Sequence, residues 1–365
     1  MINHKKKTVL KWACGIVAAL LVILAAGGWW MFGNAITAAN SIEKLGEELY
    51  SMEYTGDYGF DAFLAQGGAD VDSEVANYLV TFFSRGFYKI KSDVQPGEFG
   101  CSSIYTQGEQ GTIIFGRNYD WEERQIMIVH IKPEDGYESI SSCCLDSLGF
   151  SENYSPDGSM MERIQALAAI YFPLGGMNEK DLVVDLLEED TAETHQQTDK
   201  PDLTTTTAIR LLLDRAATVD EALSLLRQYD MNSSMGAAHH LALADASGKS
   251  VVVEYVDGEM LVTETKVVTN HYLSDCEKRG VGSAQSHLRY DTLAAHTGAA
   301  DERGVRDLLE SVAQKNYPQA AGSYEKTMWS IVYCPEGRCA HFYFAENYAH
   351  DYGLLLLEKG SFLKR

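Results

Sequence analysis

The stretch Gly100-Cys101-Ser102-Ser103-Ile104 is followed, sixteen residues after its cysteine, by Arg117 within Gly116-Arg117-Asn118-Tyr119-Asp120-Trp121. Between the two lies a strand-like run at residues 111–115, so we predict a thiol on a small loop followed by a turn. Such a turn would bring the arginine and the aspartate back toward the sulfur. A nearby cation favours the thiolate, and a carboxylate can hold an ammonium or orient a base. The pattern predicts a cysteine-dependent amide hydrolase.

The composition of the chain limits the class of protein and the kind of partner that are possible. The chain has 365 residues, of which 45% are hydrophobic and 22% charged, which is typical of a globular protein with one large core or two modest ones. Its formal net charge of −22 argues against a nucleic-acid partner, because phosphates require a basic face. The acidic surface says little about a small substrate, since a basic pocket can lie inside an acidic shell.

The N-terminus differs in kind from the rest of the chain. His4-Lys5-Lys6-Lys7 precedes an almost uninterrupted apolar run over residues 12–32, which is long enough to span a bilayer as a helix. We predict a cytoplasmic tail at 1–11, a signal anchor at 12–32 and an extracytoplasmic remainder, because flanking lysines stay inside. The alternative is a secretory signal cleaved near Ala38 or Ala39. A buried soluble helix is disfavoured by the lysine cluster.

The rest of the chain changes its sequence pattern at Cys101, from a helical leader to a mixed α and β domain. Residues 33–100 carry helical periodicity at 41–49 and 74–83, which predicts a helical leader. After Cys101, runs of β-branched and aromatic residues predict short strands, whereas residues 201–228 predict two helices. This order indicates an α+β domain over 101–365. The predicted strands are 111–115, 124–131, 182–187, 240–244, 250–255, 260–269, 328–333 and 341–345, with a hairpin turn at 245–248.

Seven cysteines do not make a disulfide scaffold in a chain of this length. Cys334 and Cys339 flank a four-residue turn and could close it in an exported protein. Cys143, Cys144 and Cys276 have no obvious partners. No paired short cysteine spacing with histidines supports zinc, so we predict no metal site.

Three further motifs follow later in the chain. They are Gly176-Met177-Asn178-Glu179-Lys180, Val268-Thr269-Asn270 and Ser286-His287-Leu288-Arg289. Together with the first two, over residues 101–344, they resemble the choloylglycine hydrolase family of linear-amide C–N hydrolases. That family includes bile salt hydrolases, penicillin V acylases, acid ceramidase and N-acylethanolamine acid amidase, and the Cys-Ser-Ser-Ile opening and long leader are most similar to the last two. The resemblance implies a four-layer αββα sandwich of the N-terminal-nucleophile type.

The resemblance also implies roles for named residues. Autocleavage of the Gly100–Cys101 bond would free the Cys101 α-amino group as the base for its own thiol, and an α-amine with a pKa of about 7.7–8.0 suits that work. Asp120 would hold this amine, and Arg117 would lie beside the sulfur and the substrate carbonyl. Asn270 would donate to the oxyanion, and Arg289 would brace the acidic network. No cofactor is implied.

Plainer interpretations remain open for several of these residues. Arg117 and Asp120 could form a structural ion pair, and Asn270 could simply end a strand. The role of Arg289 rests on the resemblance alone. Histidines 239, 240, 271 and 287 could serve as bases, but an α-amino base makes each more readily a polar packing residue.

Two positions depart from the family pattern. The turn after Asn178-Glu179-Lys180 normally has glycine, which adopts positive φ without strain, whereas this chain has Asp181. Where bile salt hydrolases have an active-site asparagine, this chain has Glu188, which we expect to line the substrate site. A carboxylate there would repel an oxyanion and an acidic bile-salt tail, which argues against a standard bile salt hydrolase.

The expected function is thus cleavage of an N-acyl amine or N-acyl amino acid through a thioester at Cys101. The alternatives are an acyltransferase of the isopenicillin N type and an unprocessed, inactive surface-binding relative. Residues 33–100 would act as a propeptide that either stays docked or releases the enzyme from the membrane after cleavage. The sequence leaves the oligomeric state open.

Overall fold

The computed structural model describes most of the chain beyond the N-terminal segment. The described residues are 27–29, 31–86, 100–121, 125–150, 153–189, 191–315, 317–318, 324–355 and 362–364. The predicted cytoplasmic tail and most of the predicted signal anchor lie outside these residues. Among the residues that are described, no helix combines the length and apolarity needed to cross a bilayer.

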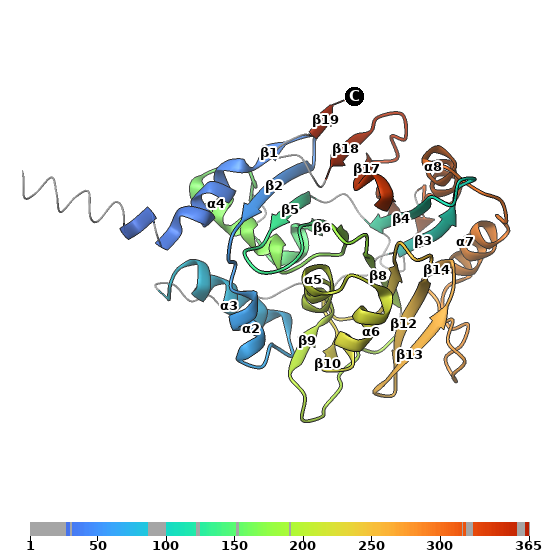
Figure 1. Ribbon diagram of the computed structural model, residues 1–365, viewed down its shortest axis with the longest axis horizontal. Helices are drawn as coiled ribbons and strands as arrows, with labels where there is room; N and C mark the ends of the chain where they lie inside the picture. The colour runs from blue at the N-terminus through green and yellow to red at the C-terminus, as the bar shows by residue number, and fades with distance from the viewer. Residues whose placement is uncertain are drawn as a thin grey trace, which may run out of the picture.

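The larger of two main sheets contains nine strands (Figure 1). Its neighbours are antiparallel except β2 and β5, which run parallel. In sheet order the strands are β1 (Glu43–Lys44), β2 (Leu49–Thr55), β5 (Ile126–Lys132), β6 (Ser139–Cys144), β7 (Gly175–Asn178), β8 (Val183–Glu189), β11 (Ala238–Ala244), β12 (Ser250–Val256) and β13 (Glu259–Glu264). Several of these strands are buried on both faces, and the polar residues that they carry, such as Asp185 and His240, are buried with them.

The second sheet carries the residues of the opening motifs. Its order is β14 (Val267–Thr269), β3 (Gly100–Gln107), β4 (Ile113–Trp121), β16 (Tyr324–Cys334), β17 (Cys339–Phe344), β18 (Tyr352–Leu355) and β19 (Phe362–Lys364), and β15 (Tyr317–Pro318) pairs with β16. The sheets face each other, with β3 in contact with β8. The strand predicted over 260–269 is wrong as a single element, because the chain leaves the first sheet after β13 and joins the second as β14.

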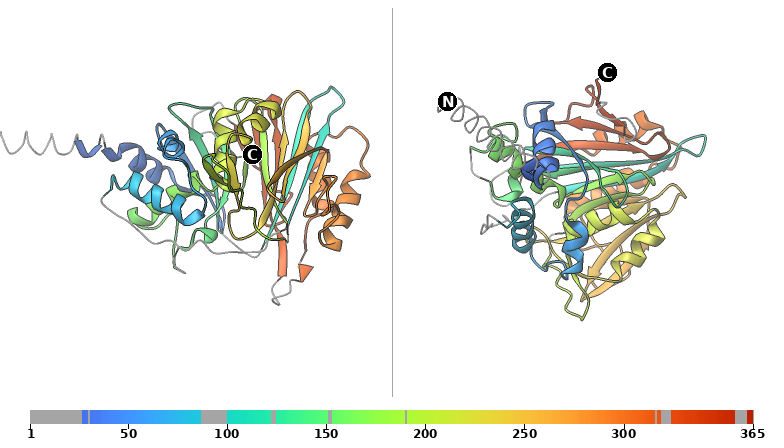
Figure 2. Two further views of the ribbon diagram at one scale, coloured as in Figure 1. Left: turned by 90° about the horizontal axis from the view of Figure 1, so that it is seen from below. Right: turned by 60° about the vertical axis from the view of Figure 1, so that its left-hand side comes forward.

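Helices cover the outer faces of both sheets. The two helices predicted within 201–228 are confirmed as α5 (Thr205–Arg215) and α6 (Val219–Leu226), which begin at the side-chain caps Thr204 and Thr218. Helix α5 contacts β7 and β8, while α7 (Ala284–Ala294) and α8 (Glu302–Ser311) pack on the second sheet. Figure 2 shows α7 and α8, in orange, across the strands from the blue leader helices. The αββα layering implied by the resemblance is therefore present.

The leader is only partly helical. Helix α3 (Asp72–Phe83) confirms the helix predicted over 74–83, and α2 (Phe60–Ala65) precedes it. The helix predicted over 41–49 is wrong, because this segment forms β1 and the beginning of β2. Strand β2 pairs with β5 along its whole length, and this long-range backbone pairing outweighs the local helical periodicity. The leader is thus an integral part of the larger sheet.

Candidate active site

Cys101 lies near the start of β3 and is fully buried. The predicted loop position is wrong, because its backbone pairs with Tyr119 in the β3–β4 hairpin. The predicted turn between the motifs is confirmed, and the same hairpin places Arg117 opposite Ser103 and Asp120 opposite Gly100. The hairpin therefore brings both motifs to one end of the second sheet.

The pleat of β4 sends Arg117 and Asp120 to opposite faces, since they are three residues apart on one strand. Arg117 points between the sheets, where its Nη2 lies 3.5 Å from Cys101 Sγ and donates to the Leu186 carbonyl at 2.6 Å. Its Nη1 bonds Asp185 Oδ1 at 3.1 Å and also the Leu174 carbonyl. The guanidinium is thus fixed from the opposite sheet and aimed at the sulfur.

Asp185 is a site residue that the sequence analysis missed. It lies on β8, is fully buried, and forms an ion pair with the equally buried Arg117. Burial raises the pKa of the Asp185 carboxyl to about 7, although Arg117 opposes the shift. A lone acid inside the apolar run of residues 182–187 was the available signal, because such an acid requires a buried partner.

Asp120 faces the helix layer and reaches Cys101 through Arg289. Arg289, on α7, forms an ion pair with Asp120 Oδ2 and donates from Nη2 to the Cys101 carbonyl oxygen at 2.8 Å. The hydroxyl of Thr327 donates to Asp120 Oδ1 at 2.6 Å, a partner that the sequence did not indicate. Asp120 therefore lies beside the backbone of Cys101 and Arg117 beside its side chain.

Asn270 completes the contacts around the Cys101 backbone. Its Oδ1 accepts from the Cys101 N–H at 2.7 Å and from Arg289 Nη2 at 2.8 Å. Its Nδ2 donates to the Glu188 carbonyl oxygen at 2.7 Å. Asn270 does follow β14 directly, as a strand-ending residue would, but it also accepts a hydrogen bond from the Cys101 backbone. Its oxyanion role stays a prediction.

Glu188 lies on β8 and is buried, with its backbone joined to Asn270. The described contacts place it at the same end of the sandwich as Cys101, through this carbonyl rather than through its side chain. Whether its carboxylate contacts substrate stays a prediction.

The thiol of Cys101 in the intact chain is uncharged at neutral pH. Burial raises the pKa of Cys101 to about 12, and the neighbouring Arg117 only partly opposes this. At neutral pH the sulfur of the intact chain therefore keeps its proton and is a weak nucleophile. Attack on a separate substrate amide would require a base that takes up this proton.

The histidines are held away from this role by other partners. His240 lies between Glu189 and Glu254, with Nδ1 2.9 Å from Glu254 Oε1. Burial opposes its charge, but the two carboxylates outweigh burial and raise the pKa of His240 to about 9. Burial lowers the pKa of His239 to about 3 and that of His271 to about 4. None of the described contacts of these rings involves Cys101.

The turn after Asn178-Glu179-Lys180 has the backbone conformation that glycine normally adopts there, although its residue is Asp181. Asp181 has φ of 69°, the left-handed conformation for which glycine is favoured. The Asn178 side chain organises the turn, accepting from the Lys180 N–H at 3.0 Å and the Leu182 N–H at 3.2 Å. The turn thus has the backbone that the motif requires, with the strain borne by an aspartate, which tolerates this region better than most residues.

Comparison with known proteins places these observations in context. Residues 169–349 match the family model of acyl-coenzyme A:6-aminopenicillanic acid acyl-transferase. Penicillin V acylase from Pectobacterium atrosepticum is 34% identical over 182 residues, covering 43% of this chain and 48% of that protein. The chain thus spans about half the length of this curated relative.

Solved structures show the same fold. Two variants of conjugated bile acid hydrolase from Clostridium perfringens superpose with TM-scores of 0.50 and 0.51, at 14% and 16% identity. Each alignment covers 70% of this chain and 92% of the other. The resemblance predicted from the sequence is thereby confirmed: the chain is related to penicillin V acylase and the 6-aminopenicillanic acid acyl-transferases and shares the N-terminal-nucleophile α+β fold of conjugated bile acid hydrolase.

Proposed function

We propose that this chain is a cysteine N-terminal-nucleophile hydrolase that cleaves a linear C–N amide bond in an N-acyl amine or N-acyl amino acid. One observation carries the proposal: Cys101 is contacted at its sulfur by Arg117, at its N–H by Asn270 and at its carbonyl by Arg289. A structural cysteine does not require three polar residues from three elements. Similarity to an acylase and an acyltransferase supports the same chemistry.

The first step is self-processing. Cys101 Sγ attacks the Gly100 carbonyl carbon, the peptide C–N bond breaks, and the thiol proton passes to the departing Cys101 nitrogen. Water then hydrolyses the resulting thioester, which leaves a Gly100 carboxylate, the Cys101 thiol and a free Cys101 α-amine. Asn270 already accepts a hydrogen bond from that nitrogen, and Arg289 holds the carbonyl oxygen of the same residue. The α-amine supplies the base that the buried, protonated thiol lacks.

Turnover repeats this chemistry on substrate. The α-amine accepts the thiol proton, Sγ attacks the amide carbonyl, and the proton passes to the leaving amine as the C–N bond breaks. Water hydrolyses the thioester to a carboxylic acid and restores the thiol. Asp120 is assigned the role of holding the ammonium, and its ion pair with Arg289 beside the Cys101 carbonyl supports this assignment.

In this proposal the side-chain amide of Asn270 stabilises the oxyanion of the tetrahedral intermediate. A side-chain amide carries two N–H groups, and one of those on Nδ2 donates to the Glu188 carbonyl. The second is left to donate to the tetrahedral intermediate, a contribution of about 2.7–4 kcal/mol in comparable sites. A Glu188 carboxylate beside the substrate would disfavour acidic substrates and so select neutral or cationic acyl amides.

The leader is proposed to anchor the enzyme and remain docked after processing. Support comes from β2, which pairs with β5 over seven residues, and from Asp72, which accepts from Ser234 Oγ at 2.9 Å and the Met235 N–H at 2.8 Å. Membrane fractionation of processed protein before and after a high-salt wash tests this. Recovery of all processed enzyme in the soluble fraction without a wash would contradict docking.

The central test is intact mass and N-terminal sequencing of purified protein. Wild type is expected to show a new terminus at Cys101, and Cys101→Ala is expected to remain whole and inactive. Cys276→Ser, a cysteine outside the site, is the control and should process normally. Wild type that hydrolyses amides while intact across the junction would overturn the mechanism. Unprocessed, inactive wild type would favour a binding module instead.

A panel of acylated amines with fatty acyl, bile acyl and phenoxyacetyl groups, read by mass spectrometry, would identify the substrate. The second candidate function is acyl transfer, favoured by the match of residues 169–349 to an acyltransferase model. Both functions share the thioester at Cys101 and differ in the acceptor. Adding a competing amine to the turnover assay separates them: a hydrolase releases mainly acid, and an acyltransferase mainly the new amide.

A further inference from the structure

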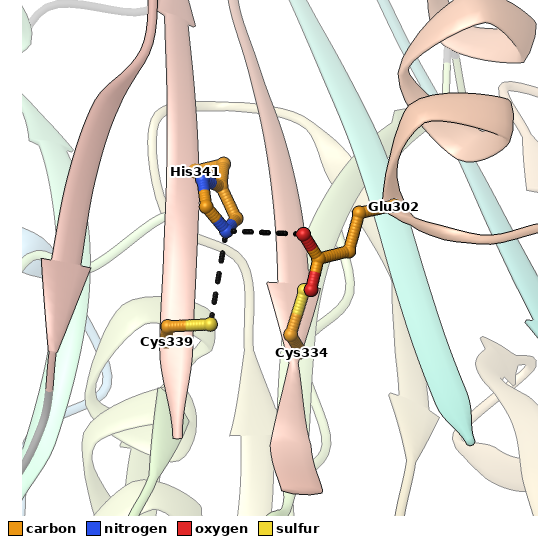
Figure 3. A group of neighbouring side chains, drawn as sticks. All are labelled: Glu302, Cys334, Cys339 and His341. Carbon is orange, nitrogen blue, oxygen red and sulfur yellow. Dashed lines mark hydrogen bonds and ion pairs between the residues drawn. The ribbon is translucent and has the colours of Figure 1, made fainter. Parts of the chain in front are cut away.

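A cluster of metal-ligating side chains lies at the far end of the second sheet, where the mechanism above makes no use of it. Cys334, Cys339, His341 and Glu302 each offer one ligand atom, and all four atoms lie within 4.8 Å of one another (Figure 3). Cys334 is seven residues along β16 from Thr327, the partner of Asp120, which is roughly 20 Å at strand spacing. The cluster is therefore separate from the catalytic site.

Strand geometry explains why these side chains converge. Cys334 and Cys339 are directly opposite each other in the β16–β17 hairpin, so their side chains share a face. His341 lies two residues beyond Cys339 and hence on the same face. Helix α8 packs over this sheet and adds Glu302 from its first turn. Three ligands come from one hairpin and the fourth from the helix that covers it, as Figure 3 shows.

The distances fit a tetrahedral ion. Bond lengths of about 2.0–2.3 Å to zinc place ligand atoms roughly 3.3–3.8 Å apart at the corners of a tetrahedron. His341 Nε2 lies 3.7 Å from Cys339 Sγ and 3.6 Å from Glu302 Oε2. Both sulfurs are free thiols in this structure. The other pairs of ligand atoms lie within 4.8 Å of one another, so contraction of the cluster by about 1 Å or less would seat an ion at its centre.

The imidazole is oriented as a ligand would be. His341 Nδ1 lies 2.7 Å from Asp351 Oδ2, which leaves Nε2 directed at the two sulfurs and Glu302. A carboxylate on the second ring nitrogen is the usual support of a zinc-bound histidine, because it fixes the tautomer and the ring orientation. This contact is a second observation, independent of the cluster itself, that points to an ion.

We propose that Cys334, Cys339, His341 and Glu302 bind a zinc ion that joins helix α8 to the β16–β17 hairpin. Two thiolates and an imidazole favour zinc over the hard cations calcium and magnesium, which prefer oxygen ligands. With four protein ligands the site is closed, and its role is structural. The ion stabilises the helix layer that also holds Asn118 Nδ2 against the Leu309 carbonyl at 2.8 Å.

Cobalt is the probe that tests the site, because sulfur-bound tetrahedral Co²⁺ has thiolate charge-transfer bands and intense d–d bands. Full-length protein, purified without chelator and titrated with Co²⁺ and then Zn²⁺, is expected to bind one ion per chain, with zinc displacing cobalt. Cys339→Ser should remove the charge-transfer bands or halve them. Glu302→Gln, an exposed position that tolerates substitution, should weaken zinc binding at least tenfold. Cys276→Ser is the matched control and should retain full binding.

Thermal unfolding gives a second readout. Zinc should raise the Tm of wild type but not of Cys339→Ser or His341→Gln, while the metal-free proteins unfold at similar temperatures. A Cys334–Cys339 disulfide found by peptide mapping of protein purified without reductant would overturn the proposal. So would cobalt spectra without thiolate bands, or bands that depend on Cys276 rather than on Cys339.

Discussion

At the residue scale, burial decides what each charged group near Cys101 can do. Arg117 is fully buried and is balanced by Asp185, two backbone carbonyls and the Cys101 sulfur. Neither ion is stable in this layer without the other, because desolvation exceeds what a lone charge can recover there. The guanidinium therefore depends on Asp185 for its position and for compensation of its buried charge.

Replacing Asp185 with Asn should consequently destabilise the fold. The variant leaves Arg117 buried without a counter-ion, and we expect a loss of about 3–5 kcal/mol in the free energy of unfolding. Urea denaturation in the Cys101→Ala background, which avoids self-processing, measures this. Asp275→Asn is the matched control, since Asp275 pairs with Arg279 at the exposed surface and should cost less than about 1 kcal/mol. Equal effects of the two substitutions would contradict a required buried pair.

At the scale of elements, the β3–β4 hairpin and helix α7 each position different residues around Cys101. The hairpin brings Arg117 and Asp120 to Cys101, and its pleat assigns one to each face. Helix α7 then joins Asp120, the Cys101 carbonyl and Asn270 through the single guanidinium of Arg289. This connection explains how a carboxylate on the helix side of the strand can influence the backbone of a residue whose side chain faces the other way.

Arg289→Lys should therefore slow self-processing. A single ammonium on a flexible stem cannot reproduce the planar fork that serves three partners, so we expect at least a tenfold slower conversion, with the fold retained. The half-life of the precursor, followed by gel or intact mass, measures this. Arg279→Lys, at an exposed position that pairs with Asp275, is the control and should process at the wild-type rate. A precursor half-life unchanged in Arg289→Lys would show that the Asp120 connection is only structural.

At the scale of the whole molecule, the leader is part of the two-sheet domain that contains Cys101. Strand β2 lies within the larger sheet, between β1 and β5, and removal would expose the edge of β5. Asp72 joins the leader helix α3 to the residues just before β11 through two hydrogen bonds. Burial raises the pKa of its carboxyl to about 6, although both hydrogen bonds oppose the shift.

The raised pKa predicts how the leader contact responds to pH. An acid whose pKa is higher in the folded state stabilises the fold most below its unfolded pKa near 3.8, and that contribution is lost as pH rises through about 6. Asp72→Asn removes the titration, so relative to wild type it should gain up to about 3 kcal/mol between pH 4 and 7. Unfolding midpoints of both chains in the Cys101→Ala background measure the difference. A relative loss of stability over that range would reverse the sign and contradict the prediction.

The amino-acid sequence by itself determined the turn that returns Arg117 and Asp120 toward Cys101 and the two helices of residues 201–228, but it placed Cys101 on a loop instead of on strand β3. The turn and the helices rest on local signals, namely helix caps and a fixed spacing between a thiol and an arginine, whereas the expectation that Asn270 and Arg289 lie near Cys101 came from the family resemblance. Only the tertiary structure revealed Asp185 and Thr327 as partners, β2 as an internal strand, and Glu302 beside the hairpin cysteines. Each of these depends on contact between segments distant in the chain, and such contact is decided by how the layers pack rather than by any local pattern.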